Sequence, residues 1–189
     1  VRRATFVLYL CPMKKLKLEE LGRLSVEEFR STTRLPVCLV LDNVRSLHNV
    51  GSAFRTGDAF AVERIILSGI TGKPPHREIQ KTALGATESV PWEHHPDAQS
   101  AVVDLKSNGY RIILIEQTTT SMALQDFVPE DGQKYALVFG NEVDGVTESL
   151  LPLADAAIEV PQAGTKHSLN VSVCMGVVLL ELYRKIKAL

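Results

Sequence analysis

The stretch Tyr135-Ala136-Leu137-Val138-Phe139-Gly140-Asn141-Glu142 places an unbroken apolar run directly before a glycine and two polar residues. A continuous apolar run of this length is typical of a strand that is covered on both faces. A glycine at its end allows the backbone to turn sharply and to approach a ligand closely, because glycine has no side chain. We therefore predict a buried strand that opens into a polar turn at Gly140.

Short apolar runs and helical segments alternate on both sides of this stretch. Ser25-Val26-Glu27-Glu28 is a capping box that opens a short helix, which we expect to end at Leu35-Pro36. The other predicted strands are 37–41, 65–67, 112–115 and a weaker one at 157–160. The other predicted helices are 49–61, a helix from Pro74-Pro75 toward Leu84, 97–109 with Asp97 as N-cap, a short one near Leu124, and 170–187. This alternation predicts an α/β fold with a mainly parallel sheet flanked by helices.

The composition predicts one globular domain in the 189-residue chain. We expect residues 1–34 to form an N-terminal extension with short helices, residues 1–12 being an upstream addition of little consequence, and residues 35–189 to form the domain. Cys38 and Cys174 lie in apolar segments and are expected to be buried free thiols; with Cys11 they form an odd, scattered set, which favours a cytoplasmic protein. The net charge of −1 counts against an obvious nucleic-acid binder, though it does not exclude RNA.

Polar residues gather where predicted strands end, and in a parallel sheet that edge is where ligands bind. The three polar segments are Asn49-Val50-Gly51 through Arg55, Phe139-Gly140-Asn141-Glu142, and His167-Ser168-Leu169-Asn170-Val171. Several other chemistries lack support. The chain has no P-loop and no dinucleotide-binding glycine motif. Asn43 and the Gly140 turn lack the carboxylate pair that magnesium usually needs, so no metal site is predicted. Ser168 lacks a nucleophile elbow.

The three segments, in this order, resemble motifs 1, 2 and 3 of the SpoU (TrmH-like) branch of the SPOUT RNA methyltransferases. The resemblance covers roughly residues 36–187. It implies transfer of a methyl group from S-adenosylmethionine to a ribose 2′-hydroxyl of RNA. It also implies a parallel α/β sheet with a C-terminal trefoil knot, and a homodimer. A near-continuous apolar surface on the predicted 170–187 helix agrees with a second subunit, since such a helix must be buried on all sides.

By this resemblance Arg55 lies at the attacking 2′-hydroxyl, and Asn49, Glu142, Ser168 and Asn170 shape the catalytic site. The cofactor is expected to bind along Phe139, Gly140, Asn141, Ile158, Val160, Ser168 and Leu169. Departures from the motifs are mild: Gln162 stands where methionine is common, Val146 where leucine is common and Gly57 where alanine is usual. None of them touches the polar set.

A guanidinium is effectively always protonated, which makes a general-base role for Arg55 awkward. Either Arg55 sits in an unusual environment, or it binds the adjacent RNA phosphate and stabilises the developing alkoxide as a cation. We favour the second version. Transfer RNA is the preferred target over rRNA, because only about 35 residues precede the predicted catalytic region and leave no room for a separate RNA-binding domain.

Two other interpretations stay open from the sequence. The first is a non-catalytic RNA-binding or cofactor-sensing protein on the same scaffold, against which the joint presence of the five polar residues argues. The second is a flavodoxin-like nucleotide-binding module. A flavoprotein would be yellow, whereas a methyltransferase would be colourless and would gain thermal stability with S-adenosylmethionine.

Overall fold

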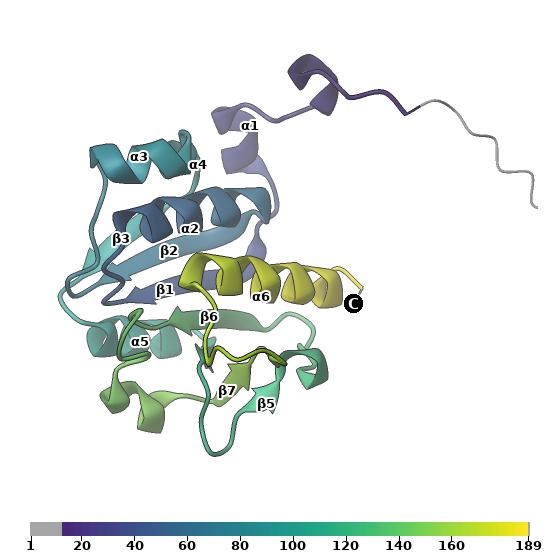
Figure 1. Cartoon of the computed structure of the whole chain (residues 1–189). Coiled ribbons are helices and arrows are strands. Elements are labelled where there is room, and N and C mark those ends of the chain that lie inside the picture. The colour runs from purple at the N-terminus through teal and green to yellow at the C-terminus, as the bar shows by residue number, and fades with distance from the viewer. Residues whose placement is uncertain (1–12, 189) are drawn as a thin grey trace, which may run out of the picture.

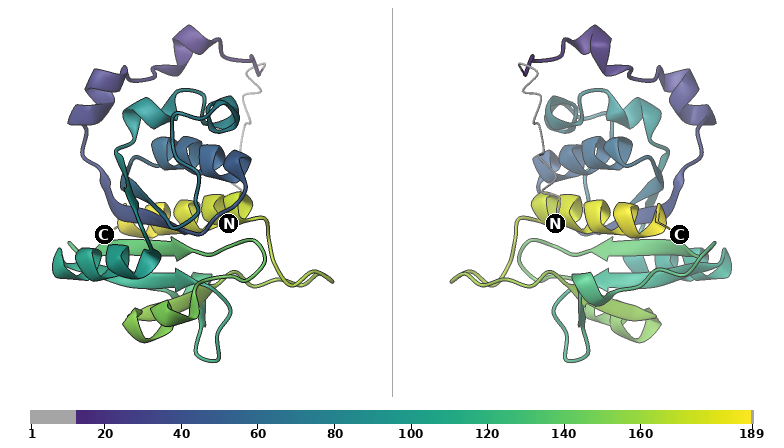
Figure 2. Two further views of the ribbon diagram at one scale, coloured as in Figure 1. Left: turned by 90° about the vertical axis from the view of Figure 1, so that its left-hand side faces the viewer. Right: turned by 90° about the vertical axis from the view of Figure 1, so that its right-hand side faces the viewer.

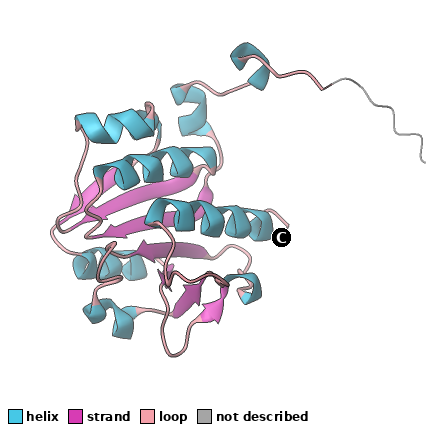
Figure 3. Ribbon diagram, viewed as in Figure 1, coloured by secondary structure: helices cyan, strands magenta, loops and turns pink. Residues whose placement is uncertain are grey.

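A seven-stranded sheet forms the centre of the computed structural model, which describes residues 13–188 (Figures 1 and 3). The strand order is β3-β2-β1-β6-β4-β7-β5 and each pairing is parallel. The strands are β1 (Leu35–Asp42), β2 (Val62–Ser68), β3 (Trp92–His95), β4 (Tyr110–Ile115), β5 (Met122–Ala123), β6 (Lys134–Phe139) and β7 (Ala156–Glu159). The predicted parallel α/β fold is therefore confirmed. The trefoil knot stays a prediction, because strand order alone does not decide it.

Helices cover both faces of the sheet (Figure 2). The helices are η1 (Leu18–Leu21), α1 (Val26–Ser31), α2 (Leu47–Ala59), α3 (Arg77–Ala83), α4 (Ala86–Ser89), α5 (Ala98–Ser107), η2 (Leu124–Asp126), η3 (Glu148–Leu153) and α6 (Val171–Ile186). Helices α2 and α6 contribute to one hydrophobic cluster, and α5 and η3 contribute to the other. The sheet is thus the middle of three layers.

Strand β1 shows why the central strands read as unbroken apolar runs. Val37, Leu39 and Leu41 point into the cluster beneath α2 and α6, while Cys38 and Val40 point into the cluster beneath α5. All five are 0% exposed. Successive side chains of a strand point to opposite faces, so a strand covered on both faces needs apolar residues at each position.

The structure corrects several predicted boundaries. Helix α1 ends at Ser31, and Pro36 already belongs to β1. Helix α2 begins two residues earlier than predicted, at Leu47, because the Ser46 hydroxyl accepts a hydrogen bond from the Asn49 backbone N–H at 3.3 Å. Helix α3 begins after Pro74-Pro75, with His76 as its N-cap. The sequence did not predict α4, β3, β5 or η3.

Helix α6 is not buried on all sides within one chain. Met175, Val178, Leu179 and Leu182 are buried against the sheet. Val173, Val177 and Leu180 are 54%, 40% and 50% exposed, and they recur at positions i, i+4 and i+7, which places them on one face. Within one chain α6 is therefore covered on one side only, and the expected burial of its other side by a second subunit stays a prediction. An apolar face on α6 remains uncovered.

Residues 13–24 lead away from the sheet (Figures 1 and 2), whereas α1 packs beside α4, where the Arg30 side chain donates to the Glu88 carbonyl oxygen at 2.9 Å. The Ser25–Glu28 capping box is present as predicted, with the Glu28 carboxylate accepting from the Ser25 N–H at 2.7 Å. The expectations for residues 1–12, Cys11 included, lie outside the described residues. Between residues 13 and 188, no helix combines the length and the apolar character that a membrane crossing requires.

The strand register brings the ends of four strands together. Phe139 at the end of β6 pairs with Leu41 of β1 on one side and with Ile115 of β4 on the other, and Ile115 pairs with Ile158 of β7. The loops that follow these residues therefore leave the sheet side by side. This carboxyl edge carries the polar segments that the sequence singled out.

Candidate active site

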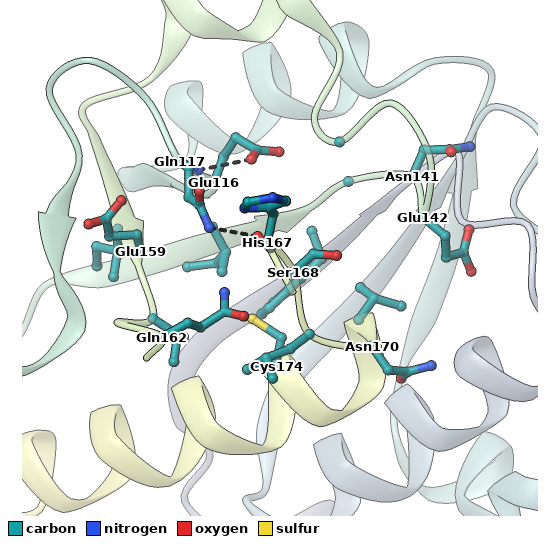
Figure 4. Close-up of a pocket in the computed structure, with 18 residues that line it drawn as sticks. Glu116, Gln117, Asn141, Glu142, Glu159, Gln162, His167, Ser168, Asn170 and Cys174 are labelled. Carbon is teal, nitrogen blue, oxygen red and sulfur yellow. Dashed lines mark hydrogen bonds between the residues drawn. The ribbon is translucent and has the colours of Figure 1, made fainter. Parts of the chain in front are cut away.

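A cavity of about 370 Å³ opens at the carboxyl edge of β4, β6 and β7 (Figure 4). Its size lies in the usual range for small-molecule sites. The seven residues predicted to bind a cofactor all line it: Phe139, Gly140, Asn141, Ile158, Val160, Ser168 and Leu169. Glu142 and Asn170, predicted to be catalytic, line it as well. The structure thus gathers most of the predicted site in one place.

The turn after β6 forms one wall of this cavity. Asn141 and Gly145 bond to each other through their backbones, and the Asn141 side-chain oxygen accepts from the Val143 N–H at 2.8 Å. A Cβ at Gly140 would lie 2.1 Å from the Gly145 carbonyl carbon, far inside contact distance. Only glycine fits there, because any side chain would push the two strands of the turn apart.

Glu142 is held by donors from the segment that starts α2. Its carboxylate accepts hydrogen bonds from the Arg45 N–H at 2.9 Å, the Ser46 N–H at 3.1 Å and the Asn49 amide at 2.9 Å. Partial burial on its own raises the Glu142 pKa, but these hydrogen bonds outweigh it and hold the pKa below its ordinary value. Glu142 is therefore an ionised acceptor that fixes the start of α2.

Asn49 and Asn170 extend this connection to α6. The Asn170 amide donates to the Asn49 side-chain oxygen at 3.2 Å. The Asn170 oxygen caps α6 by accepting from the Ser172 N–H at 2.9 Å. Glu142, Asn49 and Asn170 thus link the three polar segments, which are far apart in the sequence, into a single hydrogen-bonded cluster.

Arg55 lies outside the cavity of its own chain. It is exposed, and among the described residues it makes no hydrogen bond or ion pair. Arg55 follows His48 by seven residues and Gly51 by four, so it shares their face of α2. That face packs against α3, since His48 contacts Glu78 at 2.9 Å and a Cβ at Gly51 would meet the Ile79 carbonyl oxygen at 2.3 Å. The predicted catalytic set is therefore not assembled completely by one chain.

Two cavity residues that the sequence did not single out, Glu116 and Gln117, follow β4 directly. The Glu116 carboxylate accepts from the Gln117 N–H at 2.9 Å and from the Val146 N–H at 3.1 Å. The Gln117 side-chain amide donates to the His167 carbonyl oxygen at 2.9 Å (Figure 4). These two residues therefore join β4 to both walls of the cavity. Their position at the end of a central strand was the signal that could have found them.

Cys174 also lines the cavity, below Ser168 (Figure 4). It is half-buried rather than part of the sealed core, unlike Cys38, which is fully buried as predicted. Burial raises the pKa of the Cys174 thiol to about 11, so the thiol is protonated at neutral pH. It supplies an uncharged, apolar contact to the cavity.

The polar groups of the Asn141 turn are engaged with protein partners rather than arranged around an ion. The Asn141 amide donates to the Asn43 carbonyl oxygen at 2.8 Å, and its side-chain oxygen accepts from the Val143 N–H within the turn. Over the described range 13–188, no group of three or more His, Cys, Asp or Glu residues is placed to hold a metal ion.

Comparison with known proteins agrees with this geometry. The model of the SpoU rRNA methylase family matches residues 36–180. The chain belongs to this family. It is 34% identical over 167 residues to a tRNA (guanosine(18)-2′-O)-methyltransferase of Thermus thermophilus, covering 88% of this chain and 84% of the relative. It is 32% identical over 150 residues to a 23S rRNA (guanosine-2′-O-)-methyltransferase of Neisseria meningitidis, covering 79% of this chain but only 59% of the relative.

Solved structures agree as well. The Aquifex aeolicus TrmH/SpoU tRNA modifying enzyme superposes with a TM-score of 0.76 at 26% identity, covering 86% of this chain and 83% of that one. An AdoMet-bound rRNA methyltransferase from Sinorhizobium meliloti gives 0.74 at 26% identity, covering 82% and 59%. The prediction of an RNA ribose methyltransferase domain of this family, with S-adenosylmethionine as methyl donor, is confirmed.

The SpoU-family cavity suits this cofactor chemically. Phe139, Ile158 and Val171 give it apolar surface for a base, and Gly140 brings bare backbone to its wall. Polar side chains from Glu116, Ser168 and Asn170 face the same space. A cavity that combines apolar surface with placed polar groups can hold both the base and the polar parts of a nucleoside-containing ligand.

Proposed function

We propose that the whole protein methylates a ribose 2′-hydroxyl of tRNA. The observation that supports tRNA is the likeness to tRNA enzymes. The chain is 34% identical over 167 residues to the Thermus tRNA enzyme, and the Aquifex tRNA modifying enzyme superposes with a TM-score of 0.76. The chain spans little more than half the length of the Neisseria rRNA enzyme. Cytoplasmic location belongs to the same proposal and is supported by the free thiols of Cys38 and Cys174; fractionation that finds the protein in an oxidising compartment would contradict it.

In this proposal the cavity residues hold the methyl donor and the polar cluster positions the acceptor. S-adenosylmethionine, when bound, would supply an activated methyl group for transfer to the 2′-oxygen. Phe139, Gly140, Asn141, Ile158, Val160, Ser168 and Leu169 would bind the donor. Asn49, Glu142, Ser168 and Asn170 would fix the acceptor's approach, since most of the rate in such a reaction can come from positioning.

The assembly belongs to the proposal as well: two copies would pair through the uncovered face of α6. Val173, Val177 and Leu180 form an exposed apolar stripe on a helix whose start, Asn170, is part of the polar cluster. A dimer through this stripe would bring a second copy close to the cavity. Because Arg55 lies outside the cavity of its own chain, we assign the Arg55 that acts there to the second copy. Its role would be to stabilise the developing alkoxide or the neighbouring phosphate as a cation.

The reaction is tested with labelled S-adenosylmethionine and two acceptors, unmodified bulk tRNA and unmodified rRNA. We expect label in tRNA that survives as a 2′-O-methyl nucleoside and that disappears with Arg55→Ala. Label in rRNA alone would overturn the choice of tRNA. Cofactor binding with no transfer to either RNA would overturn the proposed reaction for this protein and favour the cofactor-sensing alternative.

The shared site is tested by mixing two inactive variants, Arg55→Ala and Gly140→Val. After subunit exchange, one site of the mixed dimer has an intact cavity and receives Arg55 from the other copy. About a quarter of wild-type activity should therefore return, because half of the dimers in an equal mixture are mixed and each of these has one working site. If Arg55 acts within its own chain, no site is complete and activity stays absent. Light scattering on Val177→Glu tests the stripe, which should yield monomers.

A further inference from the structure

The basic residues of the domain fall into two groups. Several lie within 4 Å of carboxylates: Arg64, Lys81, Lys106, Arg111, Lys134, Arg184 and Lys185. Others form no ion pair with any residue in the range 13–188, and three of these are exposed on α3 and on the loops that precede α2 and α3: Arg45, Lys73 and Arg77. We call these three residues the cation rim.

The cation rim is continuous with the polar cluster of the cavity. The backbone N–H of Arg45 donates to Glu142, which lines the cavity. The next residues, Leu47 and His48, contact the segment that carries Lys73 and Arg77. A Cβ at Gly72 would meet the Leu47 side chain at 2.2 Å, and His48 binds Glu78, the neighbour of Arg77, at 2.9 Å. The cation rim therefore lies next to the Glu142 side of the cavity.

The rim is also held in a fixed place. Helices α2 and α3 touch backbone to backbone at Gly51, where a Cβ would lie 2.3 Å from the Ile79 carbonyl oxygen. The Thr82 hydroxyl donates to the His48 carbonyl oxygen at 3.0 Å, across the same contact. Helix α3 thus cannot shift without disturbing the start of α2. The backbone that carries these cations therefore needs no rearrangement to present them together, which lowers the cost of binding.

Local charge supports the same conclusion. Between residues 45 and 81 the chain carries six Lys or Arg and three Asp or Glu, so this part has a net charge of +3. The whole chain carries −1, so the remainder carries −4. Glu78 is the carboxylate within α3, and it is engaged by Lys81 at 2.7 Å as well as by His48. A positive surface beside the cavity thus stands out from an otherwise acidic protein.

We propose that the cation rim binds backbone phosphates of the RNA on either side of the nucleotide being methylated. This rests on the proposed function, because it takes RNA as the substrate. Arg and Lys side chains that form no ion pair within the protein can bind a phosphate without first giving up a carboxylate partner. Each phosphate they neutralise releases counterions, so binding should depend on salt in proportion to the contacts made. Lys73 and Arg77 extend the RNA-binding surface beyond the residues at the reacting atoms.

The test compares Lys73→Ala/Arg77→Ala with a control that removes the same charge at the opposite edge of the sheet, Lys106→Ala/Arg111→Ala. Binding of the RNA that wild type methylates is measured at several salt concentrations. Removing two phosphate contacts should lower the slope of log affinity against log salt by roughly 1.4 to 1.8. Between 50 and 200 mM salt, wild type should then lose about tenfold more affinity than the rim variant. The control should keep the wild-type slope.

Two further measurements keep the outcomes distinct. S-adenosylmethionine affinity and the single-turnover methylation rate at saturating RNA should stay at wild-type values in the rim variant, because Lys73 and Arg77 do not line the cavity. If wild type methylates RNA but the rim variant keeps the wild-type salt slope, the rim proposal is wrong and the proposed function stands. If wild type neither binds nor methylates RNA, both are wrong. A melting temperature that falls in neither variant excludes misfolding as the cause.

Discussion

The two walls of the SpoU-family cavity are built in opposite ways. The wall made by the Gly140–Gly145 turn and Glu142 is fastened by hydrogen bonds to the start of α2 and, through Asn49 and Asn170, to α6. The wall made by residues 161–169 is exposed at each position, and its backbone is tied to the rest of the cavity by the Gln117–His167 hydrogen bond. The first wall is rigid and can position the reacting groups. The second wall can move with little loss of stability.

Glycine substitutions in the two walls should differ most strongly in their effect on S-adenosylmethionine binding. Gly140→Ala places a Cβ 2.1 Å from the Gly145 carbonyl carbon, so the turn must open and the cavity must change shape. We expect S-adenosylmethionine binding by calorimetry to fall at least a hundredfold, the equivalent of about 3 kcal/mol, with methyl transfer falling in parallel.

Gly164→Ala is the matched control in the other wall, because a Cβ there meets nothing within 4 Å and Gly164 does not have a positive φ. Its cofactor affinity should stay within about twofold of wild type, as expected for a surface change within about 0.5 kcal/mol. Equal losses of cofactor affinity in Gly140→Ala and Gly164→Ala would mean that the two walls are equally rigid.

Glu142→Gln tests the fixed wall through pH. The amide keeps the size of the carboxylate but removes its charge, and its oxygen can keep the hydrogen bonds from Ser46 and Asn49 only by turning its NH2 group, a donor, toward the Arg45 N–H. We expect the free energy of unfolding at pH 7 to fall by about 1 kcal/mol, at the low end for hydrogen bonds to a charged group because solvent screens the site.

The sign of the pH dependence follows from the lowered pKa of Glu142. Its stabilisation is present above the unfolded-state pKa of roughly 4.3 and is lost as pH falls through the lower folded-state value. Denaturant unfolding should therefore show the gap between wild type and Glu142→Gln closing below about pH 4. A gap that is constant from pH 7 to pH 3 would mean that the Glu142 charge is not what holds the wall.

The fixed wall is also the part that the sequence predicted best. Apolar runs such as 135–139 are short and alternate with helical segments, which indicates buried strands, and polar residues directly after such strands lie at the carboxyl edge of a parallel sheet. The resemblance to the family motifs added the expectation that Glu142, Asn49 and Asn170 share one site. Their hydrogen bonds could not be predicted in this way, because which oxygen accepts from which donor depends on loop geometry that has no periodic pattern.

Other features depend on orientation, which a single sequence leaves open. Arg55 is six residues from Asn49, but helical geometry turns the two side chains to different faces, so one joins the cluster and the other faces α3. Helix α6 reads as apolar all round, yet the pattern cannot say which face the chain leaves for a partner. Strand β5 has two residues, too few for any period to be seen. Glu116 and Gln117 carry no motif of their own.

Gln117→Ala should have the smallest effect, and it addresses the exposed wall alone. It removes the side-chain amide that donates to the His167 carbonyl oxygen and leaves the carbonyl in contact with water, so little is lost beyond the hydrogen bond. At about 1 kcal/mol for such a bond, the dissociation constant of S-adenosylmethionine should rise roughly fivefold, with the single-turnover rate at saturating cofactor unchanged.

Gln133→Ala, which removes equivalent side-chain bonds to the Gly109 and Lys134 carbonyl oxygens away from the cavity, should leave both quantities unchanged. A lowered single-turnover rate in Gln117→Ala would mean that the exposed wall also positions the reacting groups, and the contrast between the walls would then be one of degree.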